Sequence, residues 1–243
     1  MKFYGISDRG KVRKDNQDAF LITDGGYKFN GIVVCDGMGG TNAGNVASKL
    51  AADVFFSHLN KEYDDSVSVD KAAQLIYSAI VAANTAVYEK SSTSPEFSGM
   101  GTTLVGAVVI GSKILIVNVG DSRAYFITSS GIVRITKDHS VVEEMVTRGD
   151  ITREEARHHP QKNLITRAIG TCPNVNCDIF EIDFQPGGSL LLCTDGLSNM
   201  ITDDELFHLT ASDSSPEEIC RALVELSLLR GAPDNVTAVL LKC

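Results

Sequence analysis

The chain has 243 residues, 43% of them hydrophobic, and a formal net charge of −9. This length supports one sizeable core or two small domains, and the acidic balance argues against a nucleic-acid partner, which would need a surplus of Lys and Arg. No apolar run approaches the roughly 20 residues of a membrane span, and the N-terminus has no apolar secretion signal. We therefore expect a cytoplasmic protein with no membrane partner.

The first third of the chain changes its hydrophobic period. Alternating or continuous apolar runs come first, and apolar residues then recur every three to four positions, as they do in amphipathic helices. The pattern predicts strands at residues 2–8, 18–23 and 28–36, followed by helices at 41–60 and about 70–90. Two consecutive helices after a strand hairpin argue against alternating βα units.

Strand patterns return from residue 102 and are joined by short turns, which favours antiparallel pairing. Later helices are marked by Ser or Thr followed three residues on by Glu, a capping-box pattern. The predicted elements are strands at 102–110, 113–119, 123–128 and 132–136, helices at 140–148 and from 152, strands at 177–184 and 189–194, helices from 202 and 215, and a last strand at 236–242.

Strands in blocks and helices in pairs indicate an α+β fold. Two antiparallel sheets packed face to face, with helix pairs outside, would bury every apolar face. No linker divides the chain, so we expect one domain over residues 1–243. The chain stops one residue after its last predicted strand, so we expect no tail for a membrane anchor or a sensor domain.

Three strand-like runs end in an aspartate beside a small residue: Asp36-Gly37, Asp121-Ser122 and Asp195-Gly196. Asp234 stands just before the last strand. A single aspartate at a strand end is usually a turn former or helix cap. Repetition favours another reading, because strand ends gather their side chains at a sheet edge, and clustered carboxylates repel unless a hard cation lies between them.

Mg²⁺ and Mn²⁺ accept carboxylate, carbonyl and water oxygens, and a glycine leaves its carbonyl open to approach. Two such ions, about 3.5–4 Å apart, share a water and lower its pKa, which suits attack on phosphorus. Arg13 could bind the phosphate oxygens in a bidentate manner, although a surface arginine is normally only solvated.

Rival motifs fail in the sequence. The run from Gly5 to Lys11 nearly matches a phosphate-binding loop, but Val12 replaces the Ser or Thr that would hold Mg²⁺. No cysteine is followed six positions later by arginine, and no G-x-S-x-G or H-E-x-x-H motif occurs. The six cysteines form no C-x-x-C pair, so a zinc site or a disulfide framework has little support.

Taken in order, a set of short segments resembles the metal-dependent Ser/Thr protein phosphatase family (PPM, type 2C) in its bacterial form. The segments are SDRGKVRKDNQD (7–18), VCDGMGG (34–40), GMGTTL (99–104), NVGDSRAY (118–125), TRAIG (166–170), TDGL (194–197) and DNVT (234–237). Each motif alone is moderately specific, but their ordered combination is highly specific. The resemblance covers residues 3–242.

The resemblance implies a four-layer αββα sandwich and two Mg²⁺ or Mn²⁺ ions bridged by Asp36 and a water. Asp195 and Asp234 would serve one ion and the Gly37 carbonyl the other. Asp18 would act from the outer shell, through metal-bound waters.

The resemblance also implies a third, weaker ion held by Asp121 and Asp195, with Arg13 clamping the phosphate. Residues of roughly 147–165 would form a flap beside the cleft. The implied reaction is hydrolysis of phosphoserine and phosphothreonine in proteins by the metal-bridging water, without a phosphoenzyme. The implied partners are phosphorylated proteins and a cognate Ser/Thr kinase, and we expect a monomer.

The sequence departs from the family pattern in two places. Gln17 stands where many members carry Glu. Met38 and Thr41 stand where members of the family place a histidine that could protonate the leaving oxygen, so we expect a metal-bound water or another group to supply that proton. Two alternatives remain: a non-catalytic module that binds phosphopeptides or regulates a kinase, and a phosphohydrolase acting on a small molecule.

Overall fold

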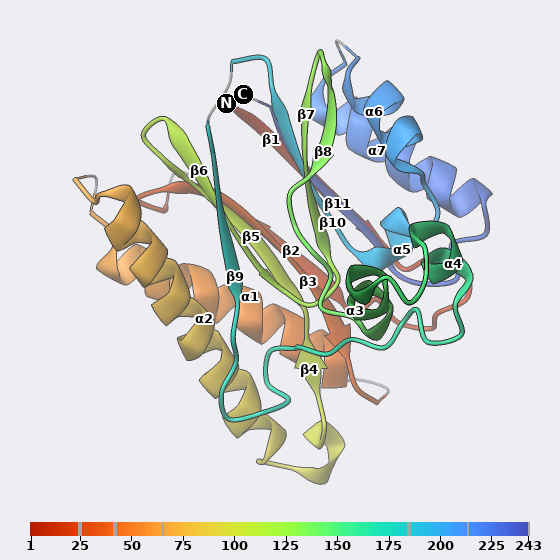
Figure 1. The fold of residues 1–243 in the computed structure, drawn as a ribbon. Helices are drawn as coiled ribbons and strands as arrows, with labels where there is room; N and C mark the ends of the chain where they lie inside the picture. Colours follow the sequence, from red (N-terminus) through yellow and green to blue (C-terminus); the bar gives the residue numbers. More distant parts are fainter. Residues whose placement is uncertain (24–25, 41–42, 65, 184–185, 213, 243) are drawn as a thin grey trace.

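A computed structural model describes residues 1–243 except for 24, 25, 41, 42, 65, 184, 185, 213 and 243. In the described part of the chain, two antiparallel sheets lie face to face with helices on their outer faces (Figure 1). One sheet has the order β1 (Lys2–Asp8), β11 (Val236–Lys242), β10 (Ser189–Cys193), β7 (Arg123–Thr128) and β8 (Gly131–Arg134). The other has the order β2 (Asp18–Ile22), β3 (Asn30–Met38), β5 (Leu104–Ile110), β6 (Lys113–Val119) and β9 (Asp178–Asp183), and β4 (Gly101–Thr102) pairs with β3.

The core between the sheets follows the two-residue period of the strands. Alternate side chains turn inward, as a pleated strand requires. The buried residues of this layer include Ile32 and Val34 of β3, Ile114 and Ile116 of β6, Leu190 and Leu192 of β10, and Val239 and Leu241 of β11. These residues join the two sheets over their whole length.

The intervening residues of the same strands face the helices. Val33 and Cys35 pack with Phe55 beneath α1 (Ala43–Glu62) and α2 (Val69–Ser91). On the other sheet, Leu191 and Leu240 pack beneath α6 (Asp203–Thr210) and α7 (Pro216–Leu229). The predicted α+β sandwich of four layers is therefore confirmed.

The remaining short elements lie at the end of the sandwich where the candidate site forms. They are a 3₁₀ turn at Pro95–Phe97, α3 (Val141–Arg148), α4 (Arg153–His158) and α5 (Asp195–Ser198). Helix α4 begins with the predicted capping box between Thr152 and Glu155. No helix in the described ranges is both long and apolar enough to cross a membrane.

One local prediction was wrong, and one short element was not predicted. The expected strand at 102–110 is divided at Thr103, whose N–H donates to the Asp36 carbonyl instead of continuing the ladder of its neighbours. The chain after β10 forms one helical turn, α5, that carries no distinct apolar period. Both departures lie beside the predicted metal ligands.

We expect Leu192→Ala to lower the free energy of unfolding by about 2–5 kcal/mol, because it leaves a cavity between the sheets. Leu192 is 0% exposed, whereas Leu229 at the end of α7 is 80% exposed. Leu229→Ala is the matched control and should change stability by no more than about 0.5 kcal/mol. Urea unfolding of both variants measures the difference, and equal losses would contradict the assigned core.

Candidate active site

The predicted acidic residues converge on one end of the sandwich. Asp36 of β3 is paired in register with Asp18 of β2. Asp195 follows β10 and Asp234 precedes β11, on the facing sheet. Asp36 and Asp195 lie close enough that the charge of Asp195 helps to raise the pKa of Asp36. Thus the edges of both sheets contribute to one acidic centre.

Two threonines and a serine fix the position of Asp36. The Thr103 hydroxyl accepts from the Asp36 N–H at 2.9 Å, and the Thr102 hydroxyl donates to the Asp36 carbonyl at 2.8 Å. Thr103 Oγ1 also lies 2.7 Å from the buried Oγ of Ser122, the residue after Asp121. These hydroxyls connect the strand of Asp36 to the turn that carries Asp121.

Asp18 is held by hydroxyl groups from the facing sheet. Its Oδ2 accepts from Thr194 Oγ1 at 2.9 Å and from Thr237 Oγ1 at 2.6 Å. Its Oδ1 is buried and has no hydrogen-bond partner. Thr194 immediately precedes Asp195, so this cluster fixes the distance between β2 and the start of α5.

The sequence motifs include Thr102, Thr103, Thr194 and Thr237 but do not indicate a role for them. A signal was available for two of the hydroxyl residues, since Ser122 directly follows Asp121 and Thr194 directly precedes Asp195, whereas Thr102 and Thr103 lie far from Asp36 in the sequence. A hydroxyl can both donate and accept, which allows it to satisfy a buried carboxylate and a backbone group together.

The glycines beside the aspartates permit close backbone packing. A Cβ at Gly37 would collide with the carbonyl of Gly44, and a Cβ at Gly196 would collide with the carbonyl of Asn235. We expected Gly37 to leave its carbonyl open to an ion. The structure adds a second requirement, because only glycine lets these backbone segments approach so closely.

Arg13 lies at the rim of the acidic centre. Its guanidinium donates to Asp234 Oδ2 at 2.7 Å, while the Arg13 side chain remains 55% exposed. This hydrogen bond, followed by the charges of Asp234, Asp36 and Asp195, raises the pKa of Arg13. The arginine is thus close enough to this centre to meet an anion bound there.

Asn235 holds the loop that carries Arg13. Its Oδ1 accepts from the Gln17 N–H at 2.8 Å, and its Nδ2 donates to the carbonyls of Arg9 and Asp15 at 2.8 and 3.0 Å. The Gln17 side chain, where family members carry Glu, donates to the Gly40 carbonyl at 3.2 Å. Sequence reasoning gave Asn235 no role of its own.

A buried histidine supports the turn before Asp121. The Gly120 N–H donates to His139 Nδ1 at 3.1 Å, and His139 Nε2 lies 3.3 Å from Asp178. Burial lowers the pKa of His139, which keeps Nδ1 free to accept this bond. Met38 closes β3 with no titratable side chain, and Thr41 lies outside the described residues.

The electrostatics of the centre favour bound protons or cations. Burial, followed by the negative charges of neighbouring carboxylates, raises the pKa of Asp36, and the same causes raise those of Asp121 and Asp195. Burial raises the pKa of Asp18 to about 7, against the opposing effect of its two hydroxyl donors. A divalent cation would compensate the same repulsion.

The donor chemistry fits a hard divalent cation. The converging groups are carboxylate and carbonyl oxygens, and the buried Oδ1 atoms of both Asp18 and Asp195 have no hydrogen-bond partner. In the described part of the chain, no three His, Cys, Asp or Glu side chains already form a metal-ligand group. Asp234 is turned onto Arg13, so binding would require this carboxylate to exchange the guanidinium for the ion.

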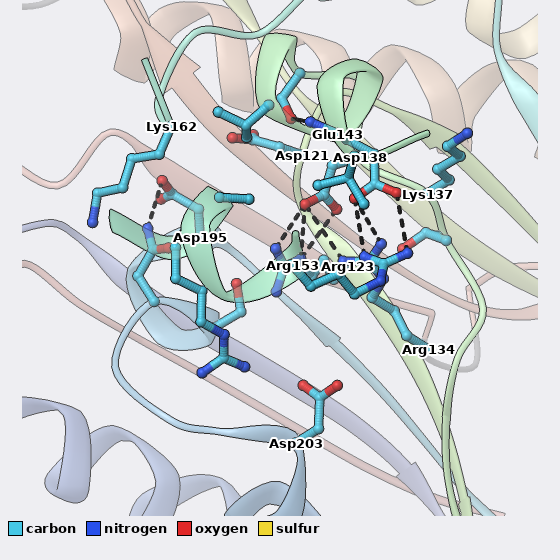
Figure 2. Close-up of a pocket in the computed structure, with 18 of the residues that line it drawn as sticks. Asp121, Arg123, Arg134, Lys137, Asp138, Glu143, Arg153, Lys162, Asp195 and Asp203 are labelled. Atoms are coloured by element: carbon cyan, nitrogen blue, oxygen red, sulfur yellow. Dashed lines mark hydrogen bonds and ion pairs between the residues drawn. The ribbon is translucent and has the colours of Figure 1, made fainter. Parts of the chain in front are cut away.

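An open cavity of about 850 Å³ adjoins the centre. Asp121 and Asp195 line its inner side, and residues of α3, α4 and the chain up to Lys162 line its outer side (Figure 2). The segment 147–165, predicted to be a flap, contributes residues to the wall of this cavity.

Comparison with known proteins places this chain in a family. The family model described as Protein phosphatase 2C matches residues 9–226. The serine/threonine phosphatase stp of Listeria innocua is 34% identical over 236 residues, which is 97% of this chain and 93% of that protein. The chain belongs to the protein phosphatase 2C family.

Solved structures agree with this assignment. The serine/threonine phosphatase Stp1 from Staphylococcus aureus has a TM-score of 0.93 and 37% identity, with 100% of this chain and 94% of that chain covered. The catalytic domain of the serine/threonine protein phosphatase PstP, solved in complex with two manganese ions, has a TM-score of 0.84 and 32% identity, with coverage of 98% and 96%.

We expect Gly196→Ala to impair both stability and catalysis, because the new methyl group must push Asp195 away from the segment of Asp234. Gly40→Ala is a suitable control, since a Cβ at Gly40 meets no atom within 4 Å. Hydrolysis of p-nitrophenyl phosphate and urea unfolding should show losses only for Gly196→Ala. A fully active Gly196→Ala variant would contradict the described packing.

The raised pKa of Asp18 predicts a pH effect in the chelator-treated protein. Between pH 3.8, the ordinary pKa of an aspartate, and about pH 7, Asp18 keeps a proton in the folded state that it has released in the unfolded chain. The contribution of Asp18 to the free energy of unfolding therefore falls as pH rises through that window. Asp18→Asn should weaken the fall, and Asp53→Asn on the exposed face of α1 should not. Urea unfolding across this pH range would contradict the account if both variants kept the wild-type slope.

Proposed function

We propose that this chain hydrolyses phosphoserine and phosphothreonine in proteins at the acidic end of the sandwich. The observation that carries the proposal is the convergence of half-buried Asp36 and Asp195 with buried Asp18 beside the exposed guanidinium of Arg13, with an unpartnered oxygen on both Asp18 and Asp195. Family membership supports the same reaction class, since the relatives compared are Ser/Thr phosphatases.

The carboxylates would hold two Mg²⁺ or Mn²⁺ ions. Asp36 would bridge them, Asp195 and Asp234 would serve one, and the Gly37 carbonyl would serve the other. Asp18, fixed by its two hydroxyl donors, would orient the outer shell. When bound, the ions supply positive charge at the phosphoryl group and lower the pKa of water. Asp121, beside Asp195, would complete a third and weaker site.

Arg13 binds and orients the substrate phosphate. Its planar fork matches two phosphate oxygens, and it lies where an incoming phosphate would meet the centre. If Arg13 bound the substrate phosphate in place of Asp234, the Asp234 carboxylate would be free to bind the ion. The thioether of Met38 has no proton to give, so the proton for the leaving oxygen comes from water or another group.

The reaction proceeds by direct attack of water. Cys35 of β3 and Cys193 of β10 are fully buried, so neither thiol can act as a nucleophile at the surface. The substrates are phosphorylated proteins, and a cognate Ser/Thr kinase supplies them. We propose a monomer that works in the cytoplasm, consistent with an acidic chain that needs no partner subunit to assemble its site.

Asp36→Asn and Asp195→Asn should each lower phosphatase activity with manganese by more than about a hundredfold, because each change removes a charge that the cation requires. Hydrolysis of a phosphothreonine peptide measures this loss. Glu89→Gln, on the exposed face of α2, is the control for removing one negative charge and should keep wild-type activity. Circular dichroism should show both Asp variants folded, and near-normal activity in either would refute the assignment.

A further inference from the structure

A group of ion pairs connects α3 and α4 to the strands of the sandwich (Figure 2). Arg123 of β7 donates to Asp138 with contacts of 2.7–3.1 Å. Glu143 of α3 accepts from Arg134 of β8 at 3.1 Å and from Arg153 of α4 at 3.2 and 3.3 Å. Asp138 and Glu143 are only 8% and 6% exposed, so their charges need these arginine partners to offset the cost of burial.

Other cations on the same cavity wall have no such partner. Arg157 and Lys162 of the segment 147–165 line the cavity and are exposed, whereas the exposed Lys137 lines it on the side opposite Lys162 (Figure 2). Within the described part of the chain, their side chains take part in no ion pair or hydrogen bond that the structure records. The side chains of Arg157 and Lys162, called the pocket cations below, are available to an incoming anion.

The acidic residues of the cavity do not cancel the pocket cations. Asp121 and Asp195 belong to the catalytic centre, where a divalent cation engages them in the proposed function. Glu154 lies 3.6 Å from His158, which carries charge only when protonated, so Glu154 offsets one positive charge of this wall and no more. Asp203 lies apart from the flap residues, towards α6 (Figure 2). The flap side of the cavity therefore has an excess of positive charge in a protein whose net charge is −9.

We propose that the pocket cations bind a second anionic group of the phosphoprotein substrate, either a carboxylate or a second phosphate a few residues from the one being hydrolysed. This inference rests on the proposed function and names its preferred substrates. The acidic protein as a whole repels acidic peptides, and this positive surface beside the catalytic centre offsets that repulsion at one place. A cavity of about 850 Å³ has room for several peptide residues.

Phosphothreonine peptides that differ at one position test this selectivity. That position carries Ala, Glu or a non-hydrolysable phosphonate analogue of phosphoserine, placed about two to six residues from the phosphothreonine, because an extended chain advances about 3.3 Å per residue. For the wild type we expect kcat/KM to be about three- to tenfold higher for the anionic peptides than for the Ala peptide. The ratio should decrease as salt rises towards about 1 M.

The double variant Arg157→Gln/Lys162→Gln should bring this ratio close to one. The matched control Lys61→Gln/Lys71→Gln removes the same charge from exposed positions on α1 and α2 and should keep the wild-type ratio. Preference for the phosphonate alone identifies a second phosphate as the ligand, and equal preference for Glu identifies any anionic side chain.

The inference is overturned if the wild type hydrolyses all peptides equally well, or if Arg157→Gln/Lys162→Gln keeps the preference. In both cases the proposed phosphatase function stands, because the peptides are still hydrolysed. If the wild type hydrolyses neither the peptides nor p-nitrophenyl phosphate with manganese, the proposed function fails and the inference fails with it.

Discussion

Repulsion among buried carboxylates is the constraint on which the active end of this molecule depends. Folding the two sheets against each other brings Asp36 and Asp18 from one sheet close to Asp195 from the other. The cost of this arrangement appears in the raised pKa values of all three groups. Hydroxyl donors and Arg13 offset part of the cost, and divalent cations would offset the remainder. The fold therefore supplies a site that favours positive charge.

The sandwich determines where this charge acts. The core between the sheets fixes the separation of the strands. The Thr103–Ser122 and Thr194–Asp18 hydrogen bonds then fix the positions of the carboxylates relative to those strands. Outside this centre, the ion pairs of Glu143 connect α3 to β8 and to α4 beside the same cavity. A rigid acidic floor and a basic outer wall thus face one another, an arrangement suited to a peptide that carries more than one negative group.

Much of this arrangement could be predicted from residues alone. Apolar residues that recur with a period of two residues predict the strands of both sheets, and those with a period of 3.6 residues predict the helices that cover them. The layers follow because each strand has two faces to bury and each helix has one. The strand-end aspartates predicted an oxygen-rich centre. The split at Thr103 and the turn α5 escaped prediction, because each depends on contacts between distant segments: Thr103 with Asp36, and Gly196 with Asn235. The pairing of Arg13 with Asp234 likewise joins residues 221 positions apart, which no local pattern encodes.

The most direct test of the account is to locate manganese in a crystal of this protein by its anomalous scattering. The account predicts two strong peaks, both in contact with Asp36, one of them also bound by Asp195 and Asp234 and the other by the Gly37 carbonyl. Absence of manganese from this centre at saturating concentration, or ions bound only elsewhere on the surface, would contradict it.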